Sequence, residues 1–131
     1  MNQQQGQGKQ PRARSRLNDA EDRLIRKVRQ TKREASDGIA NGLVLVLASL
    51  DADQEMEIRN IIGNVTEREQ ERYGHGRILD MQSDADGLWV ETETEKHAQH
   101  IADAIARARN MDVESYFDDS AKQRVLSLRP K

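Results

Sequence analysis

Hydrophobic and polar positions alternate along the middle of the chain in patterns that predict a strand followed by a helix. Residues 42–50, "GLVLVLASL", form a continuous apolar run between Gly and Asp, which is typical of a buried strand. From 51 to 74 apolar residues recur every three or four positions, which predicts an amphipathic helix capped by Asp51 or Asp53 and ended by Gly74. Its buried face would consist of Ile58, Ile61, Ile62 and Val65.

The next two apolar segments predict a pair of strands joined by a turn. Residues 77–82 and 88–93 alternate in polarity, and Asp86-Gly87 between them is a turn signal. The alternation assigns opposite faces of the sheet to two pairs of side chains, Leu88 with Val90 and Trp89 with Glu91.

A second helix and a closing hairpin complete the pattern. Thr92 and Glu95 have the spacing of a capping box for a helix that runs to about Arg109. One face of this helix is apolar and rich in alanine, which predicts close packing on a sheet: Ala98, Ile101, Ala102, Ile105 and Ala108. Residues 111–118 and 123–129 then predict two further strands.

The order of elements over residues 41–131 predicts an α+β domain of the ferredoxin-like, split βαβ class. The pattern is β-α-β-β-α-β with an added C-terminal strand. Two helices would cover one face of a mainly antiparallel sheet.

A basic helical arm is predicted ahead of this domain. Residues 1–16 are rich in Gln, Gly and Arg and have almost no apolar side chains, so we expect a disordered tail. Residues 17–38 predict a basic amphipathic helix, with a capping box at Asn18 and Glu21 and a C-terminal cap at Gly38. Its apolar stripe is thin and consists of Ala20, Leu24 and Val28.

Charge divides the chain into a basic arm and an acidic body. Residues 1–40 carry a net charge of +5 and residues 41–131 carry −7, which gives the chain its net −2. A basic tail that runs into a basic helix is suited to contacting the phosphates of RNA, and this is the first hypothesis for the arm. The alternative is a solvated helix that docks on the acidic body. The candidate RNA-contacting residues are Lys9, Arg12, Arg14, Arg16, Arg23, Arg26, Lys27, Arg29, Lys32 and Arg33.

Composition limits the remaining chemistry. The 131 residues are 35% hydrophobic and 34% charged, so the core must be small. There is no cysteine, which excludes disulfides and thiolate metal sites and makes a reducing cytoplasm the expected location. The N-terminus has no apolar signal region, and no window of 18 apolar residues predicts a membrane span.

No motif predicts an enzyme or a cofactor. The chain lacks phosphate-binding loops, GxSxG elbows and thiol nucleophiles. His75, His97 and His100, with Glu93 nearby, have the residue types of a metal site, but we favour His97 at the border of the buried stripe and His100 in solvent. "DADG" at 84–87 resembles part of a calcium loop, and a hairpin turn is the favoured interpretation.

Trp89 and Tyr116 are candidates for a protein interface on the sheet face opposite Leu88 and Val113. An RNA platform would stack bases on paired aromatics, but acidic neighbours would repel phosphates there. We therefore favour packing against the N-terminal helix or against a partner, and a homodimer is the alternative to the RNA hypothesis.

The segment "GRILDMQSDADGLWVETETEKHAQHIADAI", followed by "VLSLRPK", resembles the α/β segment of the nonsense-mediated-decay-protein-three family, the export adaptors of the large ribosomal subunit, and its small prokaryotic relatives. The shared pattern is a strand ending at Asp86-Gly87, a second strand, and a helix that starts near His97-Ala98. Family members carry paired CxxC zinc-binding elements ahead of this segment, whereas this chain has a basic helix there. The resemblance implies the α/β fold and a connection to the ribosome or to RNA.

Overall fold

The computed structural model describes residues 16–32 and 39–131, and the side chains of residues 19–30 and 39–131. The predicted tail, Arg33 and the predicted cap at Gly38 lie outside the described residues. The elements are α1 (Arg16–Lys32), β2 (Gly42–Val46), α2 (Ala52–Tyr73), β3 (Ile78–Asp84), β4 (Gly87–Thr92), α3 (Glu95–Arg109), β5 (Met111–Asp118) and β6 (Gln123–Pro130).

The strands form one mixed, mainly antiparallel sheet in the order β3-β4-β2-β6-β5. β4 pairs antiparallel with both β2 and β3, so β2, α2 and β3 make a split βαβ unit with β4 between its strands. β6 pairs parallel with β2 and antiparallel with β5. The α+β class with a split βαβ arrangement is thus confirmed, and the added strand β6 lies inside the sheet, between β2 and β5.

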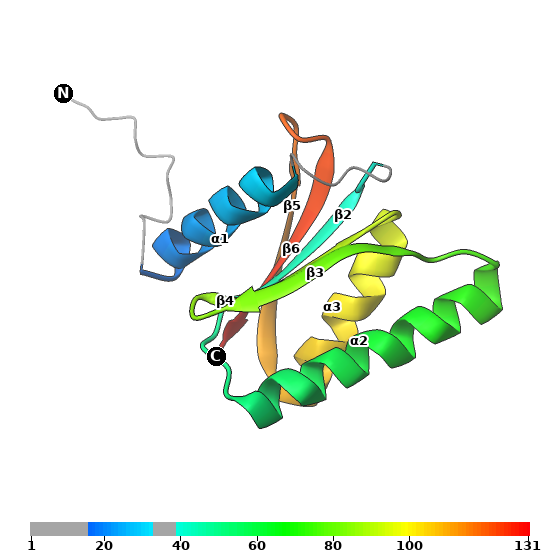
Figure 1. Ribbon diagram of the computed structural model, residues 1–131, viewed down its shortest axis with the longest axis horizontal. Helices are drawn as coiled ribbons and strands as arrows, with labels where there is room; N and C mark the ends of the chain where they lie inside the picture. The colour runs from blue at the N-terminus through cyan, green and yellow to red at the C-terminus, as the bar shows by residue number, and fades with distance from the viewer. Residues whose placement is uncertain (1–15, 33–38) are drawn as a thin grey trace.

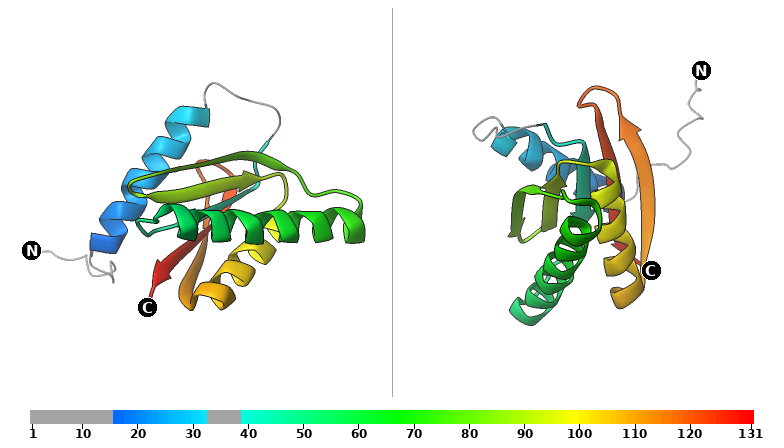
Figure 2. Two further views of the ribbon diagram at one scale, coloured as in Figure 1. Left: turned by 60° about the horizontal axis from the view of Figure 1, so that its bottom comes forward. Right: turned by 90° about the vertical axis from the view of Figure 1, so that its right-hand side faces the viewer.

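Helices cover both faces of the sheet, with α1 on the side opposite α2 and α3 (Figures 1 and 2). The larger core lies under α2 and α3, where Ile58 and Ile62 meet Val44 and Val90 of the sheet. The smaller core lies under α1 and includes Trp89. Leu88 and Val90 of β4 belong to the larger core, whereas Trp89 between them belongs to the smaller one. The side chains of β4 therefore alternate between the two faces of the sheet, as the sequence predicts.

α3 packs very close to β2, in agreement with its alanine-rich face. A Cβ atom added to Gly42 would lie 2.6 Å from the Ala98 Cβ, so the strand needs glycine at this position. The predicted face of α3 is buried except at its last member, because Ala108 lies exposed near the C-terminal end of the helix.

The helix caps confirm both predicted ends of α2 and correct the predicted start of α3. Asp51 caps α2 in a reciprocal capping box with Gln54, and Gly74 ends the helix in the left-handed conformation. The predicted cap of α3 at Thr92 is wrong, because Thr94 accepts the His97 backbone N–H. Thr92 belongs to β4.

Two smaller predictions also need correction. The capping box at Asn18 is wrong because Asn18 lies inside α1, which already includes Arg16. The turn between β3 and β4 consists of Ala85 and Asp86, and Gly87 is the first residue of β4. Across residues 16–32 and 39–131, the helices are too short or too polar to cross a bilayer.

Candidate nucleic-acid interface

The structure describes the side chains of four of the ten predicted RNA-contacting residues, and all four lie on α1. They are Arg23, Arg26, Lys27 and Arg29. Arg16 and Lys32 belong to α1 by their backbone, and Lys9, Arg12, Arg14 and Arg33 lie outside the described residues.

Lys27 binds the acidic hairpin between β3 and β4. Its Nζ lies 2.6 Å from Asp84 Oδ2 and 2.7 Å from Asp86 Oδ2, and Arg23 Nε lies 3.6 Å from the same Asp86 oxygen. Asp84 and Asp86 raise the pKa of Lys27 above its ordinary value, and the hydrogen bond from Lys27 lowers the pKa of Asp86. The pairs are partly exposed, so they orient α1 more than they stabilise it.

Arg29 binds the other end of the sheet. Its guanidinium donates to Asp118 Oδ2 at 2.9 Å and to Gln123 Oε1 at 2.8 Å. Gln123 is fully buried, and its amide in turn donates to Glu91 Oε2 at 2.9 Å. Burial of Asp118 is outweighed by hydrogen bonds from Ser120 and Arg29, which lower the pKa of Asp118. Arg29 therefore belongs to a network that continues into the interior.

The aromatic candidates for a protein interface lie beneath α1. Trp89 is only 3% exposed and packs with Leu24 and Val28 of the helix. Tyr116 is half-buried beside the same cluster, under the electrostatic influence of Glu21 of α1. Burial, together with Glu21, raises the pKa of Tyr116 well above its usual range. The face assigned to a partner is thus covered by a helix of the same chain, as the packing alternative expected.

α1 docks on the acidic body through three of the four described cations. Arg23, Lys27 and Arg29 all pair with carboxylates of the body, whereas Arg26 is exposed. The intramolecular alternative for the arm is thus realised for these three residues.

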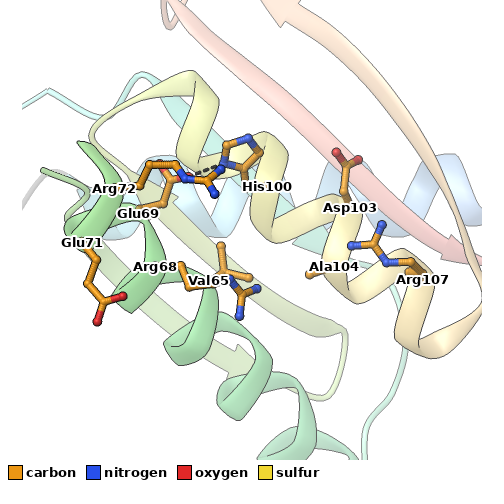
Figure 3. Close-up of a pocket in the computed structure, with 9 residues that line it drawn as sticks. All are labelled: Val65, Arg68, Glu69, Glu71, Arg72, His100, Asp103, Ala104 and Arg107. Atoms are coloured by element: carbon orange, nitrogen blue, oxygen red, sulfur yellow. Dashed lines mark hydrogen bonds and ion pairs between the residues drawn. The ribbon is translucent and has the colours of Figure 1, made fainter. Parts of the chain in front are cut away.

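A groove lined by three arginines lies on the opposite side of the sheet, between α2 and α3. The groove has a volume of about 520 Å³ and an apolar floor that includes Val65 and Ala104. Arg68 and Arg72 of α2 and Arg107 of α3 line it (Figure 3). None of these three guanidinium groups has an ion-pair or hydrogen-bond partner within the part of the chain that the structure describes.

The carboxylates along this groove form no ion pair with the three arginines in the part of the chain that the structure describes. Glu69, whose side chain is 5% exposed, binds Nδ1 of His100. Asp103 accepts a hydrogen bond from Gln99 at 3.0 Å, and Glu71 points away from the groove (Figure 3). The groove therefore offers three guanidinium groups that lack an ion-pair partner among the described side chains, although the carboxylates of Glu69, Glu71 and Asp103 also line it.

Near-parallel aromatic rings stand at the His100 end of the groove. The centre of the Tyr73 ring lies 6.5 Å from the centre of the His100 ring, and the two ring planes make an angle of 22°. The centre of the His75 ring lies 6.2 Å from that of Tyr73, with an angle of 30° between the planes. Lys96 Nζ lies 5.2 Å from the centre of the Tyr73 ring, which is a cation–π contact. We call the rings of Tyr73, His75 and His100 the ring corner. Each of the three side chains is at least partly exposed to solvent.

Gly76 allows the chain to turn back against α2 at the ring corner. Its φ of +133° favours glycine, and an added Cβ atom would lie 2.8 Å from the Glu69 Cβ. Gln70 of α2 donates to the Gly76 carbonyl at 2.9 Å and holds the turn in place.

The third histidine of the sequence analysis, His97, belongs to the interior. It is fully buried, its Nε2 lies 2.9 Å from Thr66 Oγ1, and burial lowers its pKa below the usual value. His100 does not simply face solvent, because it binds Glu69. In residues 16–32 and 39–131 no three His, Asp or Glu side chains are arranged to hold a metal ion.

Sequence reasoning missed the groove because its walls come from two separate helices. In "TEREQERYG" each arginine stands beside a glutamate, and the segment carries a net charge of −1, so it does not look basic. The one available signal is the i, i+4 spacing of Arg68 and Arg72, which places both on one side of α2. Arg107 joins them only through the packing of α3.

Comparisons with protein-family models, curated protein sequences and solved structures found no significant match to the chain.

Proposed function

We propose that the protein is a small non-enzymatic RNA-binding protein that acts in the cytoplasm, in association with the ribosome. The proposal is supported by the basic arm and by the resemblance of residues 41–131 to the export-adaptor family. Phosphate contacts by Lys and Arg give affinity without requiring a cofactor or a reaction.

The observation that carries the proposal is the segregation of positive charge at the N-terminus. Residues 1–16 contain Lys9, Arg12, Arg14 and Arg16 and no acidic residue. Lys9, Arg12 and Arg14 have no carboxylate within four positions in the sequence. Lys27 and Arg29, in contrast, already bind the body. The N-terminal segment is thus the part of the arm best suited to phosphates.

The docking of α1 supports this division of roles. Ion pairs at two ends of the sheet, through Lys27 and through Arg29, fix the direction of the helix on the body. The segment before α1 is therefore anchored to a folded domain, and Arg26 on the exposed side of α1 extends the basic surface.

The alternative function, a homodimer or protein-interaction module built on Trp89 and Tyr116, requires α1 to leave the sheet. Departure would expose Trp89 and Leu24 and separate Arg29 from Gln123. The covered face therefore favours the RNA hypothesis over this alternative.

The test is RNA binding by full-length protein in a salt series. An arm variant, Lys9→Gln/Arg12→Gln/Arg14→Gln, is compared with a control variant, Arg59→Gln/Arg109→Gln/Arg124→Gln. The control removes the same charge from side chains that are already paired with Glu55, Glu57 and Glu95.

We expect the arm variant to lower the slope of log affinity against log salt by about 2, as the loss of three phosphate contacts to a single strand predicts. The control variant should retain the slope of the unmodified chain. Absence of binding by the unmodified chain at low salt would refute the proposal, and Trp89→Ala in sedimentation experiments would then test the dimer.

A further inference from the structure

We propose that the α2–α3 groove and the ring corner together bind single-stranded RNA, with phosphates on the three arginines and a base against the rings. The inference rests on the proposed RNA-binding function and deepens it, because it names the form of RNA and a site on the body that is separate from the arm.

The guanidinium groups of the groove, which have no ion-pair partner in the described chain, favour an anionic ligand. Arg68 and Arg72 lie on one wall and Arg107 on the other, and Figure 3 shows Arg68 and Arg107 reaching into the space between the helices. Guanidinium groups bind phosphate oxygens through paired N–H donors, which makes Arg well suited to this ligand. The only carboxylate buried in the wall within the described chain, Glu69, is already bound to His100.

The shape of the groove suits an extended strand more than a compact ion. A second space of about 300 Å³ adjoins the 520 Å³ space. The two share four lining residues, Val65, Arg68, Ala104 and Arg107. The second space extends along the helices to Ile61 and Ala108. A backbone lying along this path would pass Arg72, Arg68 and Arg107 on its way from the ring corner.

The ring corner supplies the contact that distinguishes a single strand from a duplex. Tyr73 is 37% exposed, and the His100 side chain, 40% exposed, also lines the groove. Unstacked bases bind proteins by stacking on Tyr and His rings, whereas the bases of a duplex are already stacked on each other. A base at this corner therefore requires an unpaired nucleotide.

Two further contacts keep the corner in place before a ligand arrives. The buried Glu69 carboxylate fixes the ring of His100, and Lys96 sits against Tyr73 where it adds positive charge next to the base. Thus the phosphate-binding and base-binding parts meet at His100, which belongs to both.

The test uses full-length protein and a fluorescent oligouridylate of about ten nucleotides, a length within the range of single-strand sites. A groove variant, Arg68→Gln/Arg72→Gln/Arg107→Gln, is compared with the same control variant, Arg59→Gln/Arg109→Gln/Arg124→Gln. Tyr73→Leu tests the base contact alone, and an RNA duplex is the competing ligand.

We expect the groove variant to lose about tenfold or more in affinity, with a salt slope reduced by about 2, and the control variant to lose less than about twofold. Tyr73→Leu should weaken oligouridylate binding by about fivefold or more and leave the salt slope and duplex binding unchanged. Circular dichroism of each variant checks that it remains folded.

The outcomes separate this inference from the function on which it rests. Binding that falls in the arm variant, but no further in the groove variant than in the control, would overturn the groove and leave RNA binding by the arm intact. Unchanged affinity of Tyr73→Leu would overturn the single-strand contact. An unmodified chain that binds neither oligouridylate nor duplex at low salt would overturn both proposals.

Discussion

The cations on the two faces of the sheet are used in opposite ways. On one face, Lys27 and Arg29 of α1 are paired with carboxylates of the body, and the helix covers Trp89. On the other face, Arg68 and Arg107 line a groove and have no partner among the described side chains. Cations that look alike in the sequence therefore serve structure on one side and remain available to a ligand on the other.

The difference shows why positive charge in a sequence does not by itself locate a binding site. α1 holds the denser run of cations, yet the acidic tips at Asp86 and Asp118 bind much of it. The arginines of α2 and α3 alternate with glutamates in the sequence, yet packing gathers them in one groove. Four experiments test this contrast, starting with the largest expected effect.

Leu24→Asp tests whether α1 is part of the folded core. Leu24 is fully buried against the sheet, so an ionised carboxylate there should cost about 3–5 kcal/mol or detach the helix. Chemical unfolding measures the loss, and a red shift of Trp89 emission reports exposure of the indole. The matched control is Arg26→Asp on the exposed side of α1, and equal effects of the two changes would contradict the docked position.

Arg29→Met tests whether a basic residue of α1 is structural. The change removes the Arg29 donor from Gln123 Oε1 and from Asp118 Oδ2, so the free energy of unfolding should fall by about 1–3 kcal/mol. Chemical denaturation at neutral pH provides the measurement. A loss no larger than that of Arg26→Met would show that the network does not hold α1.

The buried His97 should make stability depend on pH. Its pKa in the folded chain is below the ordinary 6.5, so the unfolded chain binds more protons when the pH falls beneath that value. The contribution of His97 to the free energy of unfolding should therefore be fully present above pH 6.5. It should decline as the pH drops toward the pKa of His97 in the folded chain. Glu69 opposes this shift, while His100 and His75 add to it after burial.

Thermal unfolding from about pH 7.5 to about pH 5.5 measures the effect, within the range where histidine titrates. His97→Gln should show a flatter dependence than the unmodified chain, because the buried side chain no longer titrates. An unchanged dependence would assign the effect to other groups.

The smallest effect on stability is expected in the groove. Arg68→Gln/Arg72→Gln/Arg107→Gln removes no described ion pair, so the free energy of unfolding should change by no more than about 0.5 kcal/mol. The same denaturation experiment measures it next to Arg29→Met. A loss as large as that of Arg29→Met would mean that the groove arginines are structural, like those of α1.

Local patterns predicted most of the fold. The strand that begins at Gly42, the helix cap at Asp51 and the alternation around Trp89 each depend on near neighbours, and the structure confirms all three, although the strand ends at Val46 and not at Leu50. The caps at Asn18 and Thr92 were misplaced because Ser, Thr, Asn and Asp near a boundary offer several equivalent caps. Thr94 prevailed because Thr92 belongs to β4.

The candidate sites were predicted less well, since they depend on which elements meet. The sequence placed Trp89 and Tyr116 on one face but left open what covers it, and it gave no sign of a groove between Arg68 and Arg107. The acidic partners of Lys27 and Arg29 are 57 to 89 positions away in the chain, beyond the reach of any local pattern.

The sequence alone determined the class of the fold, the order of its elements and the division into a basic arm and an acidic body. Those features follow from periodicity and composition, which local physical chemistry fixes residue by residue. Only the tertiary structure decided that α1 covers Trp89, that β6 enters the sheet between β2 and β5, and that Arg68, Arg72 and Arg107 share one groove. Each of these depends on contacts between distant segments, because burial and charge pairing act through space and not along the chain.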